Sequence, residues 1–267
     1  VGTRPTSLSA GSATADSGLY AYADGEGNAL TTTRTITVTV ANVNDAPTRT
    51  DVTAVSLTPV NEDVAGGTGT TPPGDTVTAL FGSKFSDALD AIGGTGGSSA
   101  NTFAGVAITT NAAIAAQGYW EYSSNGSNWT PLPTVSTASA LLLNASDYLR
   151  FVPAANYFGA PGSLEARLVD DSSGAITTGT VVDVTTSGGT TRYSDSSNAV
   201  TLTTTIANVN DRPTATATTL TATTEDNADP AGATVATLGF GYSDATDNQG
   251  ANTVNAFENP GAAITGG

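Results

Sequence analysis

The chain has 267 residues, of which 24 are acidic and 8 are basic, and it contains no His, Cys or Met. The lack of His and Cys excludes a thiol nucleophile, a Ser-His-Asp triad, a thiolate zinc site and an iron–sulfur cluster. A net charge of −16 argues against nucleic acid and anionic membranes as partners, because both attract basic surfaces. The oxygen ligands that remain, which are carboxylates, amides, hydroxyls and carbonyls, suit hard cations such as calcium.

The predicted elements are short apolar or alternating strands, separated by clusters of Gly, Pro, Asn and Asp. In chain order they cover residues 76–81, 105–109, 118–124, 140–145, 148–153, 163–170, 179–186 and 199–209. Asn125-Gly126 lies between alternating aromatic flanks and predicts a hairpin. Residues 110–118 have helical propensity but fit only one or two turns, and no convincing helix is predicted. The pattern therefore favours an all-β sandwich.

The sequence contains an internal repeat. Residues 36–48, ITVTVANVNDAPT, recur as residues 202–214, LTTTIANVNDRPT, which places Asn42 and Asn208 at matching positions 166 residues apart. Self-similarity at a fixed spacing is typical of repeated structural units. We expect a window cut from a longer polypeptide, with no signal peptide at its start and no membrane insertion. The expected units are the end of one repeat at 1–47, a complete repeat at 48–213 and the start of another at 214–267.

The repeated segment resembles a known family. ANVNDAP is similar to the linker between cadherin-like domains, and VNDAP with a following NED or TED resembles the cadherin-like or Ig-like tandem repeats of giant bacterial surface adhesins. The resemblance implies an all-β chain of tandem Ig-like or cadherin-like β-sandwich repeats, each of about 166 residues. It also implies an extracellular or cell-surface protein whose neighbouring repeats are its partners and which extends or builds a stalk or fibre.

The resemblance further implies calcium between successive repeats. For the first junction the implied ligands are Asp24, Asn42, Asn44, Asp45 and Glu62 or Asp63. For the second junction they are Asp170 or Asp171, Asn208, Asn210, Asp211 and Glu225 or Asp226. The linkers depart from the family pattern, with Ala41 or Ala207 at the first acidic position and Ala46 or Arg212 at the closing Asn. We therefore expect fewer ions per junction than in animal cadherins. The same Asn-Asp-x-Pro sequence also fits a purely structural Asx-turn.

Two further acidic patterns are present in the sequence. Asp87 and Asp90 keep the same three-residue spacing as Asp244 and Asp247, which fits either an acidic loop site or, more ordinarily, a solvated turn. Residues 24–28 carry oxygen ligands at alternate positions, like the opening of an EF-hand loop. The twelfth position of that loop is a Thr and not a Glu, so the EF-hand interpretation fails and a solvated turn is favoured.

Catalysis is not expected. Glycoside hydrolysis needs only two carboxylates, and Glu121 and Glu165 are the Glu residues deep within the complete repeat. Both lie in alternating strands, where a solvent-facing charge is the ordinary explanation. The chain is therefore predicted not to be an enzyme.

Two alternatives to a calcium-stiffened stalk stay open. A glycan- or ligand-binding adhesin module would use Trp120, Tyr122 and Trp129 as an exposed platform on the predicted hairpin, and burial of the two Trp side chains would argue against it. A self-assembling filament or surface-layer subunit would form a homo-polymer or associate laterally through edge strands rich in Thr and Val.

Overall fold

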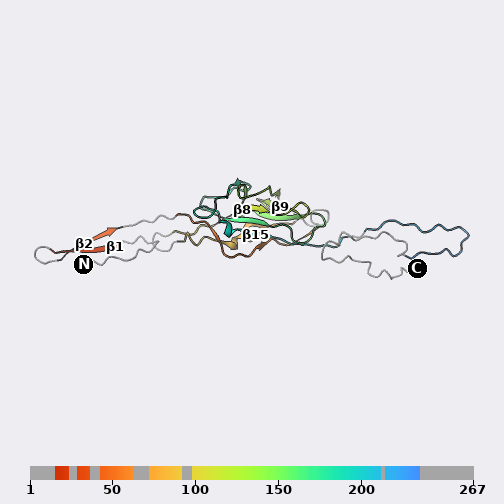
Figure 1. Ribbon diagram of the computed structural model, residues 1–267, viewed down its shortest axis with the longest axis horizontal. Helices are drawn as coiled ribbons and strands as arrows, with labels where there is room; N and C mark the ends of the chain where they lie inside the picture. Colours follow the sequence, from red (N-terminus) through yellow and green to blue (C-terminus); the bar gives the residue numbers. More distant parts are fainter. Residues whose placement is uncertain are drawn as a thin grey trace.

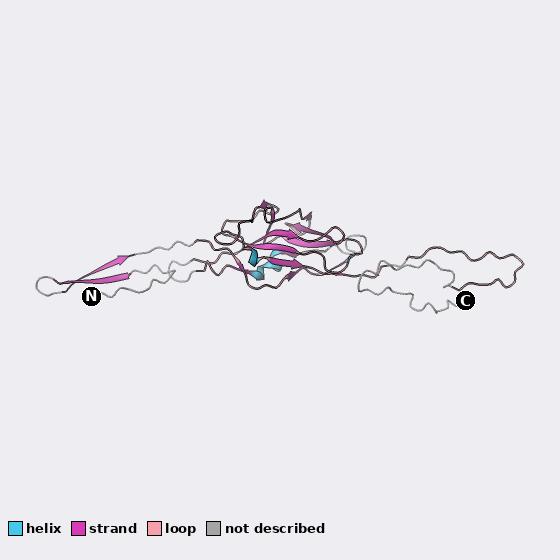
Figure 2. Ribbon diagram, viewed as in Figure 1, coloured by secondary structure: helices cyan, strands magenta, loops and turns pink. Residues whose placement is uncertain are grey.

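The structure, a computed structural model, describes residues 16–23, 29–36, 43–62, 72–91, 98–211 and 214–234. Its elements are β1 (Asp16–Ala23), β2 (Ala29–Ile36), β3 (Thr48–Arg49), β4 (Val55–Ser56), β5 (Val60–Asn61), β6 (Asp75–Thr76), α1 (Val77–Phe81), η2 (Gly82–Lys84), β7 (Phe85–Ser86), β8 (Phe103–Asn111), β9 (Gly118–Ser123), β10 (Thr130–Pro131), β11 (Ala140–Asn144), β12 (Tyr148–Pro153), β13 (Leu164–Asp170), β14 (Val181–Val182), η3 (Ser196–Asn198), β15 (Val200–Thr203) and β16 (Ile206–Ala207). Strands far outnumber helical turns, which confirms the all-β prediction (Figure 2). Within the described residues, no helix has the length and apolar character needed to cross a membrane.

Two sheets form the body of the molecule (Figure 1). One has the strand order β10-β9-β12-β6, and the other has the order β14-β11-β8-β13-β15-β4. Side chains from both sheets join a single apolar core, so the sheets pack against each other. At its centre the Trp120 ring meets Phe151 edge-on, with 5.1 Å between ring centroids. Alternation along each strand sends every second side chain into this core.

The six-stranded sheet is also covered on its other face. Ala107, Leu142 and Val169 point away from the main core and form a second apolar cluster with residues of the segment 171–199. Ile176 and Val184 come from that segment. Because both faces of the sheet are buried, the sequence of β11 is a continuous run of apolar residues and does not alternate with polar ones.

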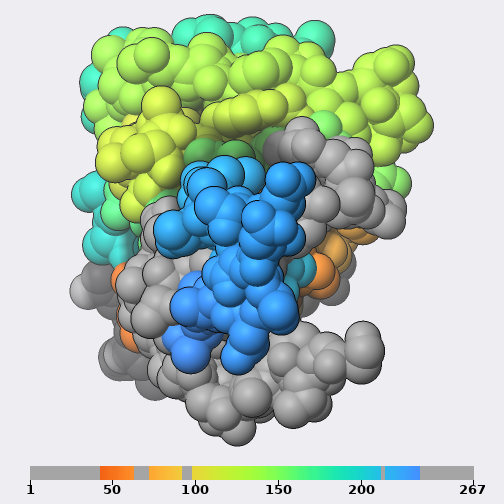
Figure 3. Space-filling model, turned by 90° about the vertical axis from the view of Figure 1, so that its right-hand side faces the viewer, coloured from red at the N-terminus to blue at the C-terminus, as the bar shows by residue number. Residues whose placement is uncertain are grey.

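Two strands near the start of the unit pair in parallel with its last two strands. β4 pairs with β15, and β5 pairs with β16, whereas the other paired strands are antiparallel. The chain therefore enters the body at one end and leaves it at the other (Figure 1). Viewed from the carboxyl-terminal end, residues 214–234 lie in front of the body (Figure 3).

The strand predicted at 76–81 is wrong over most of its length, because residues 77–81 form α1. The Thr76 side chain accepts a hydrogen bond from the Ala79 amide and so caps the start of the helix. Val77, Leu80 and Phe81 are buried, and their i, i+3, i+4 spacing is the helical period.

Two other predicted strands are shorter than expected. Only Val181–Val182 is strand within 179–186. The run 199–209 is divided into β15 and β16, because β15 belongs to the six-stranded sheet while β16 pairs with β5. The hairpin predicted at Asn125-Gly126 is present, since β9 and β10 pair across it and Gly126 has a φ of 68°.

Candidate cation site at the first junction

The segment 43–47, which precedes β3 and is called the first linker below, contacts the two-sheet body through hydrogen bonds. The Asn44 side chain donates to the Thr191 carbonyl (3.2 Å) and accepts from the Asn101 side chain (2.6 Å). The Ala46 amide donates to the Gly189 carbonyl (2.7 Å). The segment 171–199 therefore supplies acceptors that hold the linker in place, and the loop before β8 supplies a donor.

Three buried carboxylates lie beside this linker. Asp87 and Asp90 follow β7, and a main-chain hydrogen bond from Asp90 to the Asp87 carbonyl closes the turn between them. Asp170 is the last residue of β13, and pairing with Phe103 of β8 places it at the sheet end from which Asn101 leads into β8. The exposed fractions of the three Asp residues are 5%, 0% and 0%. Buried carboxylates are uncommon unless they are paired or bind a cation.

Part of this acidic group is hydrogen-bonded to the linker and to Asn101. Asp87 Oδ2 accepts from the Asn101 amide (2.7 Å). Asp90 Oδ1 accepts from the Asp45 amide (2.8 Å), and Asp90 Oδ2 accepts from Asn101 Nδ2 (3.2 Å). The residues of the linker and of the unit thus form one polar network.

Two oxygens of this group have no hydrogen bond. Asp87 Oδ1 and Asp170 Oδ2 are buried and accept none. Neither of the two ion pairs among the described residues includes these carboxylates. The nearby Arg192 guanidinium donates to the main-chain oxygen of Asp170 and not to its carboxylate. Such buried, unpaired acceptors cost free energy that a bound cation would recover.

The environment shifts the protonation equilibrium of Asp87. Burial, together with the negative charges of Asp90 and Asp170, raises the pKa of Asp87 to about 6, although a hydrogen bond from the Asn101 amide opposes the shift. A group with this pKa is partly protonated in mildly acidic solution. Protons and cations are therefore alternative ways of neutralising the same cluster.

We expect the metal-free chain to become less stable as the pH rises from 4 to 7. The folded Asp87 carboxyl has a pKa of about 6 against an ordinary value of 3.8, so the folded state binds more protons in this range. Folding is then favoured at the acidic end, and the loss by pH 7 approaches roughly 3 kcal/mol. Urea unfolding in chelator at several pH values measures this slope. Asp87→Asn should flatten it, and an unchanged slope in that variant would contradict the assignment.

The opposite end of the unit carries a second group of predicted ligands. Glu62 is 1% exposed, and its Oε1 accepts from the Val209 amide (2.7 Å). The side-chain amide atoms of Asn208 are buried and form no hydrogen bond with the described residues. These residues lie where the chain leaves the unit toward the second linker.

The two linkers share one local contact. Asn44 Nδ2 donates to the Asp45 carbonyl (3.2 Å), and Asn210 Nδ2 donates to the Asp211 carbonyl (3.0 Å). In this contact the Asn side chain acts as a donor, so it differs from the Asx-turn, in which the side-chain oxygen accepts from the backbone two residues on. The repeated sequence therefore adopts a repeated local geometry.

The structure groups the predicted ligands differently from the sequence-based assignment. Asp170, expected at the second junction, lies with Asn44 and Asp45 at the first, and Glu62, expected at the first, lies beside Val209 at the second. The reason is topological, because β13 ends at the end of the sheet where the first linker enters.

Other predicted ligands are exposed or fall outside the description. Asp171 is exposed and accepts from the amide and hydroxyl of Thr102, which lower its pKa. Glu225 and Asp226 are exposed in a turn. Five residues that were assigned or weighed as ligands lie outside the described residues, namely Asp24, Asn42, Asp63, Asp244 and Asp247.

Two expectations of solvent exposure are wrong. Asp87 and Asp90 are buried and not part of a solvated turn. Glu121 is 7% exposed and pairs with Arg150 at 2.6 Å, whereas Glu165 is exposed as expected. The sequence reasoning also missed Asn101 as a ligand candidate. The Asp pair is recognised in the sequence by its recurrence in both copies of the repeat, but that recurrence does not reveal its burial.

The predicted aromatic platform is not formed. Trp120 is 1% exposed and donates through Nε1 to the Gly162 carbonyl (3.1 Å). Tyr122 packs against the main core. Trp129 is half-buried, and the Arg150 guanidinium covers its ring at 4.0 Å. The hairpin therefore uses its aromatic rings for packing and for a cation–π contact.

No group of three or more His, Cys, Asp or Glu side chains within the described ranges could, as it stands, hold a metal ion. Comparisons with protein-family models, curated proteins and solved structures find no match. The chemistry of the junction accordingly follows from its own residues. These offer carboxylates, Asn side chains and main-chain carbonyls, which are the ligands that calcium takes in mixed shells of six to eight oxygens.

Proposed function

We propose that the chain is a segment of an extracellular or cell-surface structural protein whose repeats of about 166 residues extend a stalk or fibre. Calcium binds where a linker meets the next unit and fixes the joint between them. The sequence repeat supports the tandem arrangement, and the local contact shared by the two linkers supports an equivalent joint at each.

The observation that carries the proposal is the buried group formed by Asp87, Asp90 and Asp170. Three carboxylates with little or no exposure lie together beside the linker, and two of their oxygens accept no hydrogen bond. A structure rarely keeps such a group without a neutralising partner. No basic side chain among the described residues pairs with them.

Calcium fits this group better than magnesium or a transition metal. The available ligands are oxygens alone, since the chain has no His or Cys. In the structure the three Asp side chains are too far apart to bind one metal ion together. A cation would draw them closer and complete its coordination shell with amide oxygens and water. The longer bonds and flexible coordination of calcium tolerate such a shell, whereas magnesium demands near-ideal octahedral geometry.

The linker would be included in such a shell or in its immediate surroundings. Asn44 and Asp45 already contact Asn101 and Asp90, so a cation at the buried carboxylates would tighten a network that spans linker and unit. The joint would then have fewer accessible orientations. A stalk made of such units would be straighter with calcium than without it.

Calcium titration and small-angle X-ray scattering of the 267-residue chain test this function. Isothermal titration calorimetry at pH 7.5 is expected to show calcium binding, and the scattering curve in calcium is expected to give a longer, better-defined maximum dimension than in chelator. The double variant Asp87→Asn, Asp90→Asn should lose both effects. Asp183→Asn, at an exposed turn whose Asp accepts from Thr185, is the matched control. Absence of binding together with identical scattering in both conditions would refute the proposal.

A further inference from the structure

The strands at the two ends of the unit's chain lie next to each other. Val55 of β4 is opposite Leu202 of β15, and Val60 of β5 is opposite Ile206 of β16. Both segments run in the same direction, so the incoming chain approaches from one end of the pair and the outgoing chain leaves from the other (Figure 1). We call β4–β15 and β5–β16 together the terminal strand pair.

Hydrogen bonds cross the terminal strand pair along its length. The Leu57 amide donates to the Thr203 carbonyl (2.9 Å), and the Val60 amide donates to the Thr205 carbonyl (3.3 Å). These bonds lie across the strands, and a force along the strands therefore acts on all of them together.

Side chains add to these main-chain bonds. Glu62 Oε1 accepts from the Val209 amide (2.7 Å) at one end of the pair, and the Thr203 hydroxyl donates to the Val55 carbonyl (3.3 Å) at the other. Leu57 and Leu202 are buried in the main core with 1% and 0% exposure. Sliding one strand past the other would also break these apolar contacts.

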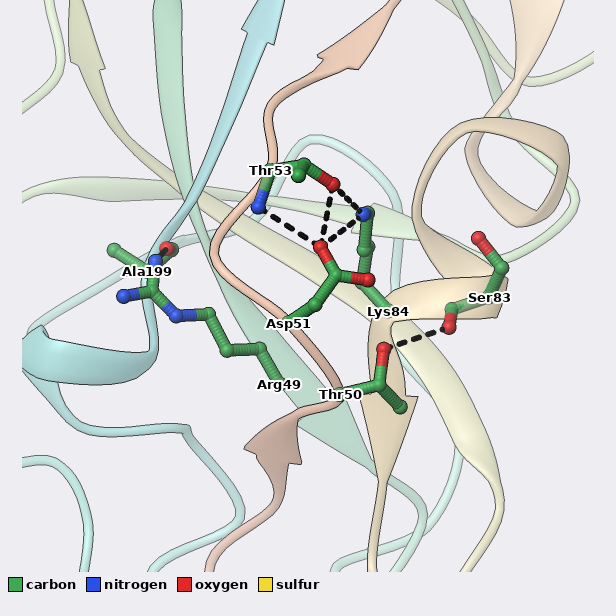
Figure 4. Close-up of polar contacts among 7 residues, drawn as sticks. All are labelled: Arg49, Thr50, Asp51, Thr53, Ser83, Lys84 and Ala199. Atoms are coloured by element: carbon green, nitrogen blue, oxygen red, sulfur yellow. Dashed lines mark hydrogen bonds and ion pairs between the residues drawn. The ribbon is translucent and has the colours of Figure 1, made fainter.

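The segment just before β4 is fixed to the body as well (Figure 4). Lys84 Nζ donates to Asp51 and to the Thr53 hydroxyl, and the Lys84–Asp51 ion pair measures 2.5 Å. Arg49 Nη1 donates to the Ala199 carbonyl (2.7 Å), directly before β15. Tension on the first linker therefore reaches the terminal strand pair through a segment that is itself bound on both sides.

We propose that the terminal strand pair makes the unit resist unfolding under tension applied through its two linkers. Such tension pulls β4 and β5 one way and β15 and β16 the other, so their hydrogen bonds must break together. A force that separates the strands from one end breaks the bonds one after another and needs less force. This property goes beyond the proposed function, because it belongs to the folded unit and requires no cation.

Single-molecule pulling in two geometries tests the inference. The chain has no Cys, so two introduced thiols define the points of attachment without ambiguity. In the first geometry, Val52→Cys with Ala215→Cys applies force along the terminal strand pair. In the second, Val52→Cys with Thr201→Cys applies force at one end of the pair, so that the strands separate from that end. Unfolding of the unit releases roughly 500 Å of chain, as expected for about 160 residues, and identifies the event. We expect a clearly higher unfolding force in the first geometry, and equal forces would overturn the inference.

A substitution pair isolates the hydrogen bonds. Val60→Pro removes the amide that bonds to Thr205, whereas Val60→Ala keeps the amide and removes most of the side chain. In the first geometry Val60→Pro should unfold about fivefold faster than Val60→Ala at the same force, which corresponds to one hydrogen bond. Equal rates would count against the inference. If Val60→Pro does not fold, the comparison of the two pulling geometries in the chain that keeps Val60 still tests the inference.

Each pulling experiment is run with calcium and with chelator. The difference between geometries is expected in both conditions. A chain that binds no calcium but still shows the difference would refute the proposed calcium joint and leave the terminal strand pair supported. A chain that binds calcium but shows no difference between the two geometries would support the calcium joint and overturn the inference about the terminal strand pair.

Discussion

Addition of calcium is expected to raise the free energy of unfolding of the 267-residue chain by about 3 kcal/mol at a hundredfold excess over the dissociation constant. For a unit of this size, that stabilisation corresponds to a rise in melting temperature on the order of 5–10 °C. The physical reason is the neutralisation of Asp87, Asp90 and Asp170, whose charges repel one another in a buried position. Differential scanning calorimetry in calcium and in chelator measures the shift.

Asp170→Asn gives this prediction its sharpest control. Asparagine keeps an oxygen that can accept from the Ser172 amide and hydroxyl, as Asp170 Oδ1 does, but it removes the buried charge. The variant should melt at or above the temperature of the unchanged chain in chelator and should gain nothing from calcium. Asp183→Asn should keep the full calcium response. A calcium response that survives in Asp170→Asn would contradict the site.

Trp120→Ala is expected to lower the free energy of unfolding by about 3–5 kcal/mol. Trp120 is almost fully buried, packs edge-on against Phe151 and donates to the Gly162 carbonyl, so truncation leaves a cavity and an unpaired acceptor. Urea unfolding measures the loss.

Trp129→Ala is the matched comparison, because it truncates the same residue type on the same hairpin. Its ring is half-buried beneath Arg150, and the loss should be about 1 kcal/mol. Similar losses in the two variants would mean that Trp120 does not have the core role assigned to it. A Trp120→Ala chain of unchanged stability would support the alternative in which the hairpin presents its aromatic rings as a ligand-binding platform.

Much of the fold could be predicted from local patterns. Apolar runs bounded by turn residues predicted β8, β11, β12 and β13 with errors of a few residues, because strand formation and burial leave a direct pattern in the sequence. The helix α1 was missed because a five-residue segment fits both the helical and the strand period, and its Thr76 cap was not recognised. Local patterns also cannot show where one long strand changes partners, as between β15 and β16.

The candidate site was harder to predict. Asn44 and Asp45 could be found because their motif recurs, but the burial of Asp87 and Asp90 depends on the chain that folds over them. Asp170 was assigned to the second junction, but it lies at the first, because the end of the sheet that β13 reaches decides which linker it faces. Such long-range geometry is not present in residue spacing.

The pairing of β4 with β15 also sets the order in which the unit can fold. Val55 meets Leu202 only after nearly the whole unit has been made, and the acceptors that hold the first linker, Gly189 and Thr191, also come late in the chain. Contacts this distant in sequence form slowly. During synthesis, the unit therefore cannot close until its last strands have been made. A chain of such units would mature one repeat at a time, in order from its amino-terminal end.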